Sequence, residues 1–307
     1  MALHVIVGAG PVGSATARLL AGRGEEVRLI TRRGGGPSVP GVQLVAADAT
    51  DAATLARHAA GAAALYSCAG PAYHRWPTDW PPLGAALLHA AESSGAVLVT
   101  TGNLYAYGAV DGPMTEQLPP RPNSVKGAVR AELWAGQLAA HEAGRIRTAE
   151  VRGSDYLGAG TMSAFTALVL PKVLAGKRAS APADLDAPHS WTYVGDVART
   201  LVAVADDKEA WGRPWHVPTA PPMSLRRLAT RAAELAGAPA ARVTTMPGIA
   251  LRLAGLFTPA AREMVEMQYQ LRAPFVLDSS AATAAFGIEP TPTDDALRET
   301  IESLRES

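Results

Sequence analysis

Short apolar runs alternate with longer amphipathic segments over the first two thirds of the chain. The runs are typical of buried strands, and the segments between them have the apolar spacing of helices. Strands that alternate with helices in this way favour a parallel sheet with helices on both faces. The predicted strands are residues 3–7, 27–31, 42–46, 63–67, 96–101 and 147–152, and the predicted helices are 12–23, a segment ending near 58, 83–94 and 126–143.

The pattern loosens after residue 152, where prolines separate short segments. A helix at 194–205 and a strand at 215–217 are predicted to return to the sheet. The remainder predicts a small, mostly helical lobe that covers the carboxyl ends of the strands, where open α/β sheets bind their ligands. Its predicted helices are 225–236, 249–256, 259–270 and 294–306.

The first predicted strand runs into a glycine-rich turn with Gly8, Gly10 and Gly13. Such glycines allow a tight turn, a close approach of the backbone to a pyrophosphate, and close packing of the next helix. That helix, which opens with Pro11 and Val12, directs free N–H groups at the phosphates. We therefore predict a doubly wound Rossmann sheet, with a dinucleotide-binding domain at 1–155 and 191–218 and a substrate lobe at 156–190 and 219–307.

Two arginines, Arg32 and Arg33, follow the second predicted strand, where an NAD-binding chain usually has a carboxylate. A guanidinium can bind a ribose 2'-phosphate through paired, charge-assisted hydrogen bonds, so we predict NADP(H) in preference to NAD(H). Two solvated loop arginines are the alternative. Residues after the third and fourth strands complete the predicted cofactor site: Asp48 and Ala49 near the adenine, and Ala69, Gly70 and Pro71 beneath the dinucleotide.

Composition narrows the class of protein. Lys and Arg together number 28, as do Asp and Glu, so the net charge is zero and neither nucleic acid nor an anionic membrane is predicted as a partner. Cys68 is the only cysteine, which excludes an internal disulfide. The seven histidines lack metal-binding spacing, so we predict no metal. No basic leader and no long apolar run stands out, and we expect a cytoplasmic protein.

Several motifs together resemble the extended short-chain dehydrogenase/reductases, of the NAD-dependent epimerase/dehydratase type. The resemblance covers nearly the whole chain, and it implies the predicted fold and a nicotinamide cofactor. The residues that carry it are the glycine turn at 8–13, Asp48, the segment 103–108, Glu116 and Pro122, the segment 152–158, and the segment 189–198.

The catalytic motif departs from that family. Its members usually carry Tyr-x-x-x-Lys at the start of the helix after the fifth strand, with a Ser or Thr in the preceding loop. Here Lys126 replaces the tyrosine, Arg130 replaces the lysine, and Asn103 falls near the Ser/Thr position. By resemblance, Arg130 would hold the nicotinamide ribose. Lys126 would transfer the proton, as a lysine does in the branch similar to isoflavone reductases, if its surroundings destabilise the charged form. A solvated lysine is the alternative.

Further candidate residues lie near the predicted strand ends. The hydroxyl of Tyr105 is the alternative replacement for the missing tyrosine, and Thr101 is placed to bond the cofactor or the substrate. An aromatic segment after the fourth strand either lines the substrate site or caps the lobe. The predicted substrate contacts are Tyr73, His74 and Trp76 of this segment, together with Tyr156. Gly153 and Ser154, which follow the sixth predicted strand, belong to the predicted cofactor site.

These residues predict an NADP(H)-dependent oxidoreductase that transfers a hydride to a carbonyl, an imine or an activated alkene of a small molecule. Two alternatives stay open: an epimerase of the sugar-nucleotide type, and a dinucleotide-binding sensor without catalysis. We also expect a homodimer, because related folds pair the helices predicted here at 83–94 and 126–143. Their apolar residues are Leu87, Leu88, Leu133, Trp134 and Leu138.

Overall fold

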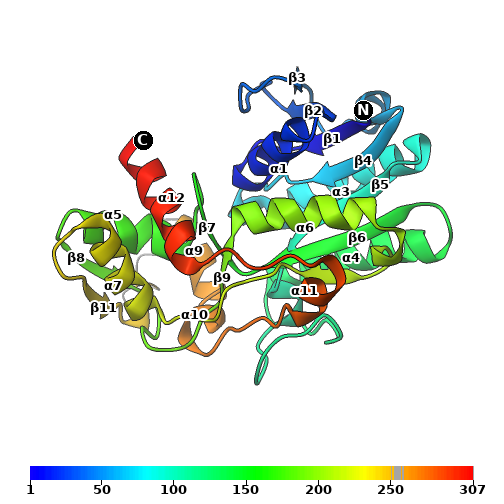
Figure 1. Cartoon of the computed structure of the whole chain (residues 1–307). Coiled ribbons are helices and arrows are strands. Elements are labelled where there is room, and N and C mark those ends of the chain that lie inside the picture. The colour runs from blue at the N-terminus through cyan, green and yellow to red at the C-terminus, as the bar shows by residue number, and fades with distance from the viewer. Residues whose placement is uncertain (250, 252–256, 258, 307) are drawn as a thin grey trace.

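A seven-stranded parallel sheet forms the centre of the computed structural model, which describes residues 1–249, 251, 257 and 259–306 (Figure 1). The strand order is β10-β6-β5-β4-β1-β2-β3, so the direction of winding reverses between β1 and β4. This order confirms the predicted doubly wound Rossmann fold. The strands are β1 (Leu3–Val7), β2 (Glu26–Thr31), β3 (Val42–Ala46), β4 (Ala62–Ser67), β5 (Val97–Asn103), β6 (Arg147–Gly153) and β10 (Pro214–His216).

Helices cover both faces of this sheet and bury its side chains. Successive residues of a strand point to opposite faces. Ile6 of β1 therefore packs with one set of helices, whereas Val5 and Val7 pack with the other. The first set is α1 (Pro11–Gly22) and α6 (Val194–Asp206), and the second is α2 (Ala52–Ala59), α3 (Trp76–Ser94) and α4 (Val125–Glu142).

The later part of the chain builds a smaller region with a hydrophobic cluster of its own. Phe165, Leu228 and Leu297 are fully buried in this cluster, which lies beyond the carboxyl ends of the strands. The proposed boundaries of two domains stay a prediction. The elements are β7 (Asp155–Leu157), α5 (Leu170–Leu174), β8 (Arg178–Ala181), β9 (Trp191–Tyr193), α7 (Leu225–Ala236), β11 (Arg242–Thr245), α9 (Pro259–Glu266), α10 (Tyr269–Arg272), α11 (Ser280–Phe286) and α12 (Thr293–Glu306).

Several predicted boundaries were wrong. The aromatic segment after β4 is a short helix, Tyr73–Arg75, that runs into α3 at Trp76, so α3 begins seven residues before the predicted position 83. Pro77, in the first turn, removes only an N–H group without a helical partner. Pro81 and Pro82 lie inside the helix, which continues through them. The predicted helix 259–270 divides into α9 and α10, and the predicted helix 249–256 lies mostly outside the described residues.

No helix in the described part of the chain is long and apolar enough to cross a membrane.

Candidate functional site

The turn between β1 and α1 requires glycine at two of its three positions. Gly8 has φ +102°, and a Cβ there would lie 2.6 Å from the backbone of Ala69. A Cβ on Gly13 would lie 1.9 Å from the carbonyl oxygen of Gly8, so this residue allows α1 to approach the strand. Gly10, in contrast, has nothing within 4 Å of its Cβ position and caps the N-terminus of α1. The turn therefore presents open backbone next to a helix N-terminus, which suits an anion.

A cavity of about 680 Å³ opens in front of this turn, across the carboxyl ends of β1, β2 and β4. It lies at the reversal point of the sheet, where doubly wound folds bind ligands. The volume is in the range of a small-molecule or cofactor site. The structure brings eight of the predicted cofactor residues together in its wall: Gly8, Gly10, Arg32, Asp48, Ala49, Ala69, Gly70 and Pro71.

Charged side chains gather where β2 and β3 end at this cavity. Arg32 lines the wall, whereas Arg33 is exposed and is not among the described lining residues. The carboxylate of Asp48 accepts the backbone N–H of Thr50 at 2.9 Å and its hydroxyl at 2.8 Å, and these bonds hold the pKa of Asp48 below its usual value.

An ion pair that was not predicted from the sequence lies at the same cavity. Arg75 donates from Nε and Nη2 to one oxygen of Asp79, at 3.1 Å and 2.9 Å, and both residues line the wall. Their spacing of four residues is the usual signal of a pair on one helix face. It was not recognised because this segment was predicted as a loop.

Lys126 lies in the first turn of α4, and only 2% of its side chain is exposed, so the alternative of a solvated lysine is wrong. Its Nζ donates to Glu266 at 2.7 Å and also to Glu263, and its backbone N–H donates to Glu266 at 2.9 Å. The ammonium also lies 5.2 Å from the ring centre of Tyr73. The two glutamates were not predicted, because they lie on α9, about 140 residues further along the chain.

Three predicted aromatic residues assemble beside Lys126. The hydroxyl oxygens of Tyr73 and Tyr105 are 2.5 Å apart. The rings of Trp76 and Tyr105 are stacked, with 6.1 Å between their centres. Burial raises the pKa of Tyr73 to about 12 and holds the pKa of Tyr105 well above its usual value. Loss of the proton is therefore disfavoured at both hydroxyls. His74 is exposed.

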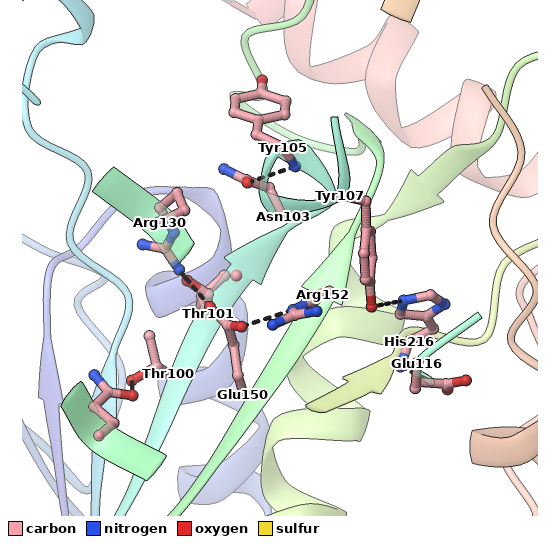
Figure 2. Close-up of polar contacts among 12 residues, drawn as sticks. Thr100, Thr101, Asn103, Tyr105, Tyr107, Glu116, Arg130, Glu150, Arg152 and His216 are labelled. Carbon is pink, nitrogen blue, oxygen red and sulfur yellow. Dashed lines mark hydrogen bonds and ion pairs between the residues drawn. The ribbon is translucent and has the colours of Figure 1, made fainter. Parts of the chain in front are cut away.

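Asn103 shapes the turn that carries Tyr105. Its side-chain oxygen accepts the backbone N–H of Tyr105 at 3.1 Å, as Figure 2 shows. An asparagine that bonds to the backbone two residues on is typical of a turn.

Arg130 lies one turn further along α4 and is also buried. Its Nη2 donates to the carbonyl oxygen of Thr101 at 2.7 Å and to Glu150 at 3.0 Å, and its guanidinium lies over the ring of Trp80. The hydroxyl of Thr101 is directed at Cys68, with 3.5 Å between the oxygen and the sulfur. Arg130 is thus held at the end of β5 by a backbone carbonyl of β5 and the side chain of Glu150 on β6 (Figure 2).

The segment after β6 closes over the end of β5. The hydroxyl of Tyr156 donates to the carbonyl oxygen of Gly102 at 3.3 Å, and a Cβ on Gly153 would lie 2.8 Å from the Tyr156 ring. The N–H of Ser154 donates to Thr192 at 3.0 Å. Gly153 and Ser154 therefore position Tyr156 above the strand ends.

Comparison with known protein families agrees with this geometry. Residues 4–217 match the family described as the NAD dependent epimerase/dehydratase family. The chain belongs to this family. No curated protein sequence matches the chain.

Solved structures of similar fold include several proteins whose descriptions name NAD. MoeE5 in complex with UDP-glucuronic acid and NAD has a TM-score of 0.81 at 20% identity. The UDP-glucose 4-epimerase of Thermus thermophilus, in complex with NAD, has a TM-score of 0.79 at 21% sequence identity. The UDP-glucuronic acid 4-epimerase of Bacillus cereus, in complex with NAD, has a TM-score of 0.78 at 18% sequence identity. In each case 99% of both chains is covered. This epimerase/dehydratase family member therefore shares its whole fold with them.

Within residues 1–249, 251, 257 and 259–306, no group of three or more His, Cys, Asp or Glu side chains is arranged to hold a metal ion.

Proposed function

We propose that this epimerase/dehydratase family member is an NAD(P)-dependent enzyme that acts on a sugar-nucleotide substrate by transient oxidation of a hydroxyl-bearing carbon. The observation that carries the proposal is the cavity at the glycine turn, whose wall extends to Ala72, next to the group formed by Tyr73, Tyr105 and Lys126. Family membership and the sugar nucleotides named for similar structures favour this reaction over the simple reduction that we placed first from the sequence.

The residues of the cavity suit a dinucleotide. Gly10 leaves room for a pyrophosphate at the N-terminus of α1, whose dipole favours negative charge. Arg32 supplies a cation for a ribose 2'-phosphate, and we therefore keep NADP(H) as the preferred cofactor, although the similar structures are described with NAD. The bound nicotinamide would accept a hydride from the substrate carbon and return it.

Lys126 is our first candidate for the proton transfer. When the substrate carbonyl is reduced, its ammonium would donate a proton to the oxygen. When the hydroxyl is oxidised, Nζ would first pass a proton to Glu266, at 2.7 Å, and would then accept the hydroxyl proton as the hydride leaves the carbon. Tyr105 is the second candidate, because its hydroxyl is buried beside the same group. Arg130 and Thr101 would face the nicotinamide ribose from the end of β5. Tyr73, Trp76 and Tyr156 would contact the substrate.

Cofactor binding followed by product analysis tests the proposal. NADPH and NADH are titrated separately, and the protein is then incubated with UDP-glucose, UDP-glucuronic acid and dTDP-glucose plus oxidised cofactor, while new sugar proton signals are followed by NMR. We expect tight binding of a dinucleotide and the appearance of an epimer or a dehydrated keto sugar. Absence of dinucleotide binding would refute the proposal. Tight binding without conversion of any sugar nucleotide, but with reduction of simple ketones, would restore the reductase interpretation.

A further inference from the structure

One strand, β6, and one helix, α4, contribute three charged side chains that are buried together behind the proposed nicotinamide site. Glu150 and Arg152 lie two residues apart on β6, so both point to the same face of the sheet. One carboxylate oxygen of Glu150 accepts from Arg152 Nε at 2.7 Å, and the other accepts from Arg130 Nη2 at 3.0 Å. Figure 2 shows Glu150 between the two guanidinium groups.

The burial of this triad makes the carboxylate essential to the position of Arg130. The side chains of all three residues are at most 3% exposed, and an isolated charge at such a depth is strongly unfavourable. Glu150 is the only acidic partner that ion-pairs with Arg130 within the described residues. Arg152 is fixed in turn, because its guanidinium lies 4.9 Å from the ring centre of Tyr107, which hydrogen-bonds His216 at 2.9 Å.

A glycine makes room for the carboxylate. Gly102 of β5 pairs with Arg152 in the sheet, and a Cβ at Gly102 would lie 2.7 Å from an oxygen of Glu150 and 2.8 Å from its Cγ and Cδ. Any larger residue at this position would displace Glu150. Arg130 also keeps a buried Nε without a hydrogen-bond partner in the described part of the chain. A buried donor of this kind is costly unless a bound group satisfies it.

We infer that Glu150 is a positioning residue for cofactor binding, and that Gly102 provides the space for it. The inference rests on the proposed function, in which Arg130 contacts the nicotinamide ribose. A lysine at position 130 would reach the ribose as a flexible point charge, whereas a planar guanidinium must be held in one orientation to direct its remaining donors. Glu150 and the Thr101 carbonyl together fix that orientation.

A double-mutant cycle tests this inference. Titrations use whichever of NADPH and NADH binds more tightly, together with the matching fragment that lacks the nicotinamide ribose, adenosine 2',5'-bisphosphate or ADP. Glu150→Gln, which preserves shape and removes charge, should raise the Kd of the whole cofactor about tenfold or more and change the Kd of the fragment less than about twofold. In the Arg130→Met protein, Glu150→Gln should cause almost no further change in the Kd of the whole cofactor.

Gly102→Ala is the second variant, for the case in which Glu150→Gln does not fold. It should also raise the Kd of the whole cofactor more than the Kd of the fragment. Glu92→Gln, which removes a carboxylate from an exposed ion pair with Arg145, is the control and should change neither Kd. The inference would be overturned if the Kd of the fragment rose as much as the Kd of the whole cofactor. It would also be overturned if Glu150→Gln had the same effect in the unsubstituted protein and in Arg130→Met. If Arg130→Met leaves binding unchanged, the inference fails while the dinucleotide proposal stands. If the unsubstituted protein binds no dinucleotide, both fail.

Discussion

Two carboxylates from another part of the chain form ion pairs with the buried Lys126. Glu263 and Glu266 are each about one fifth to one quarter exposed, so they keep contact with water while their oxygens reach the ammonium. Removal of one partner from such a pair usually costs more than the pair contributes, because the remaining charge is left without compensation. Ion pairs and a backbone hydrogen bond therefore connect the first turn of α4 to α9.

Replacement of Lys126 separates proton transfer from cofactor binding. We expect Lys126→Met to keep the NAD(P)H affinity within a few-fold and to lower turnover about 100-fold or more, the scale of a lost general acid. Binding is measured by titration and turnover by product formation. Lys172→Met, at an exposed position on α5, is the control. Unchanged turnover in Lys126→Met would make Tyr105 the next residue to test.

We predict that the two arginines after β2 determine the choice of cofactor. Arg32→Ala combined with Arg33→Ala should abolish a preference for NADP(H), with a loss of about 1 to 3 kcal/mol of charge-assisted contact. Calorimetric titration of both cofactors measures this. Arg18→Ala, at an exposed position of α1, should leave the ratio of the two affinities unchanged. If the unsubstituted protein binds NAD(H) and NADP(H) equally, the prediction fails before any substitution is made.

At the scale of elements, α6 is connected to the C-terminal segment through one buried carboxylate. Asp196 is 1% exposed and accepts the backbone N–H and the hydroxyl of Thr291, each at 2.7 Å, as well as Arg199 at 2.5 Å. This aspartate thus joins the Rossmann sheet's helix layer to the chain that leads into α12.

We expect Asp196→Ala to lower the free energy of unfolding by about 2 to 3 kcal/mol, because the N–H of Thr291 would lose its partner. Asp206→Ala is the matched control on the same helix. Asp206 also pairs with an arginine, Arg23, but both side chains are nearly half exposed, so the loss should be about 1 kcal/mol at most. Urea denaturation of the three proteins measures both values. Equal losses would show that Asp196 does not connect these elements.

The sequence predicted best those elements whose determinants lie close together in the chain. Gly8 and Gly13 are dictated by the turn that they form, and the alternation of apolar runs with amphipathic segments predicted the sheet and its main helices. The four-residue strands β8 and β11 were missed, because so short a run has no recognisable period.

The polar part of the candidate site was predicted only in part, because its partners come from distant segments. Tyr73 and Tyr105 were named from their places after strands, and Lys126 from its alignment with the Tyr-x-x-x-Lys motif. Their meeting, however, depends on how α3 and α4 pack. Glu263 and Glu266 belong to a helix whose own sequence gives no sign of a site. Glu150 was missed as well, because a single acid in an apolar strand carries no local signal of its two arginine partners.

At the scale of the whole molecule, α3 and α4 lie side by side with little space between them. A Cβ on Gly84 of α3 would lie 2.6 Å from Leu133 of α4. Leu87 and Trp134 are buried within one subunit, which accounts for two of the five apolar residues that predicted a dimer. The other three, Leu88, Leu133 and Leu138, are half-buried.

These half-buried leucines lie on helices whose exposed positions include the small residues Ala85, Ala135 and Ala139, so a second copy could approach closely. We predict a homodimer through α3 and α4, with a mass by light scattering of twice 31.8 kDa at micromolar concentration. Ala139→Arg should shift the mass to that of a monomer, because a long charged side chain would separate the paired helices. Ala284→Arg, at an exposed position of α11, should leave the mass unchanged. A monomer mass for the unsubstituted protein would refute the prediction, and a dimer that persists in Ala139→Arg would place the interface elsewhere.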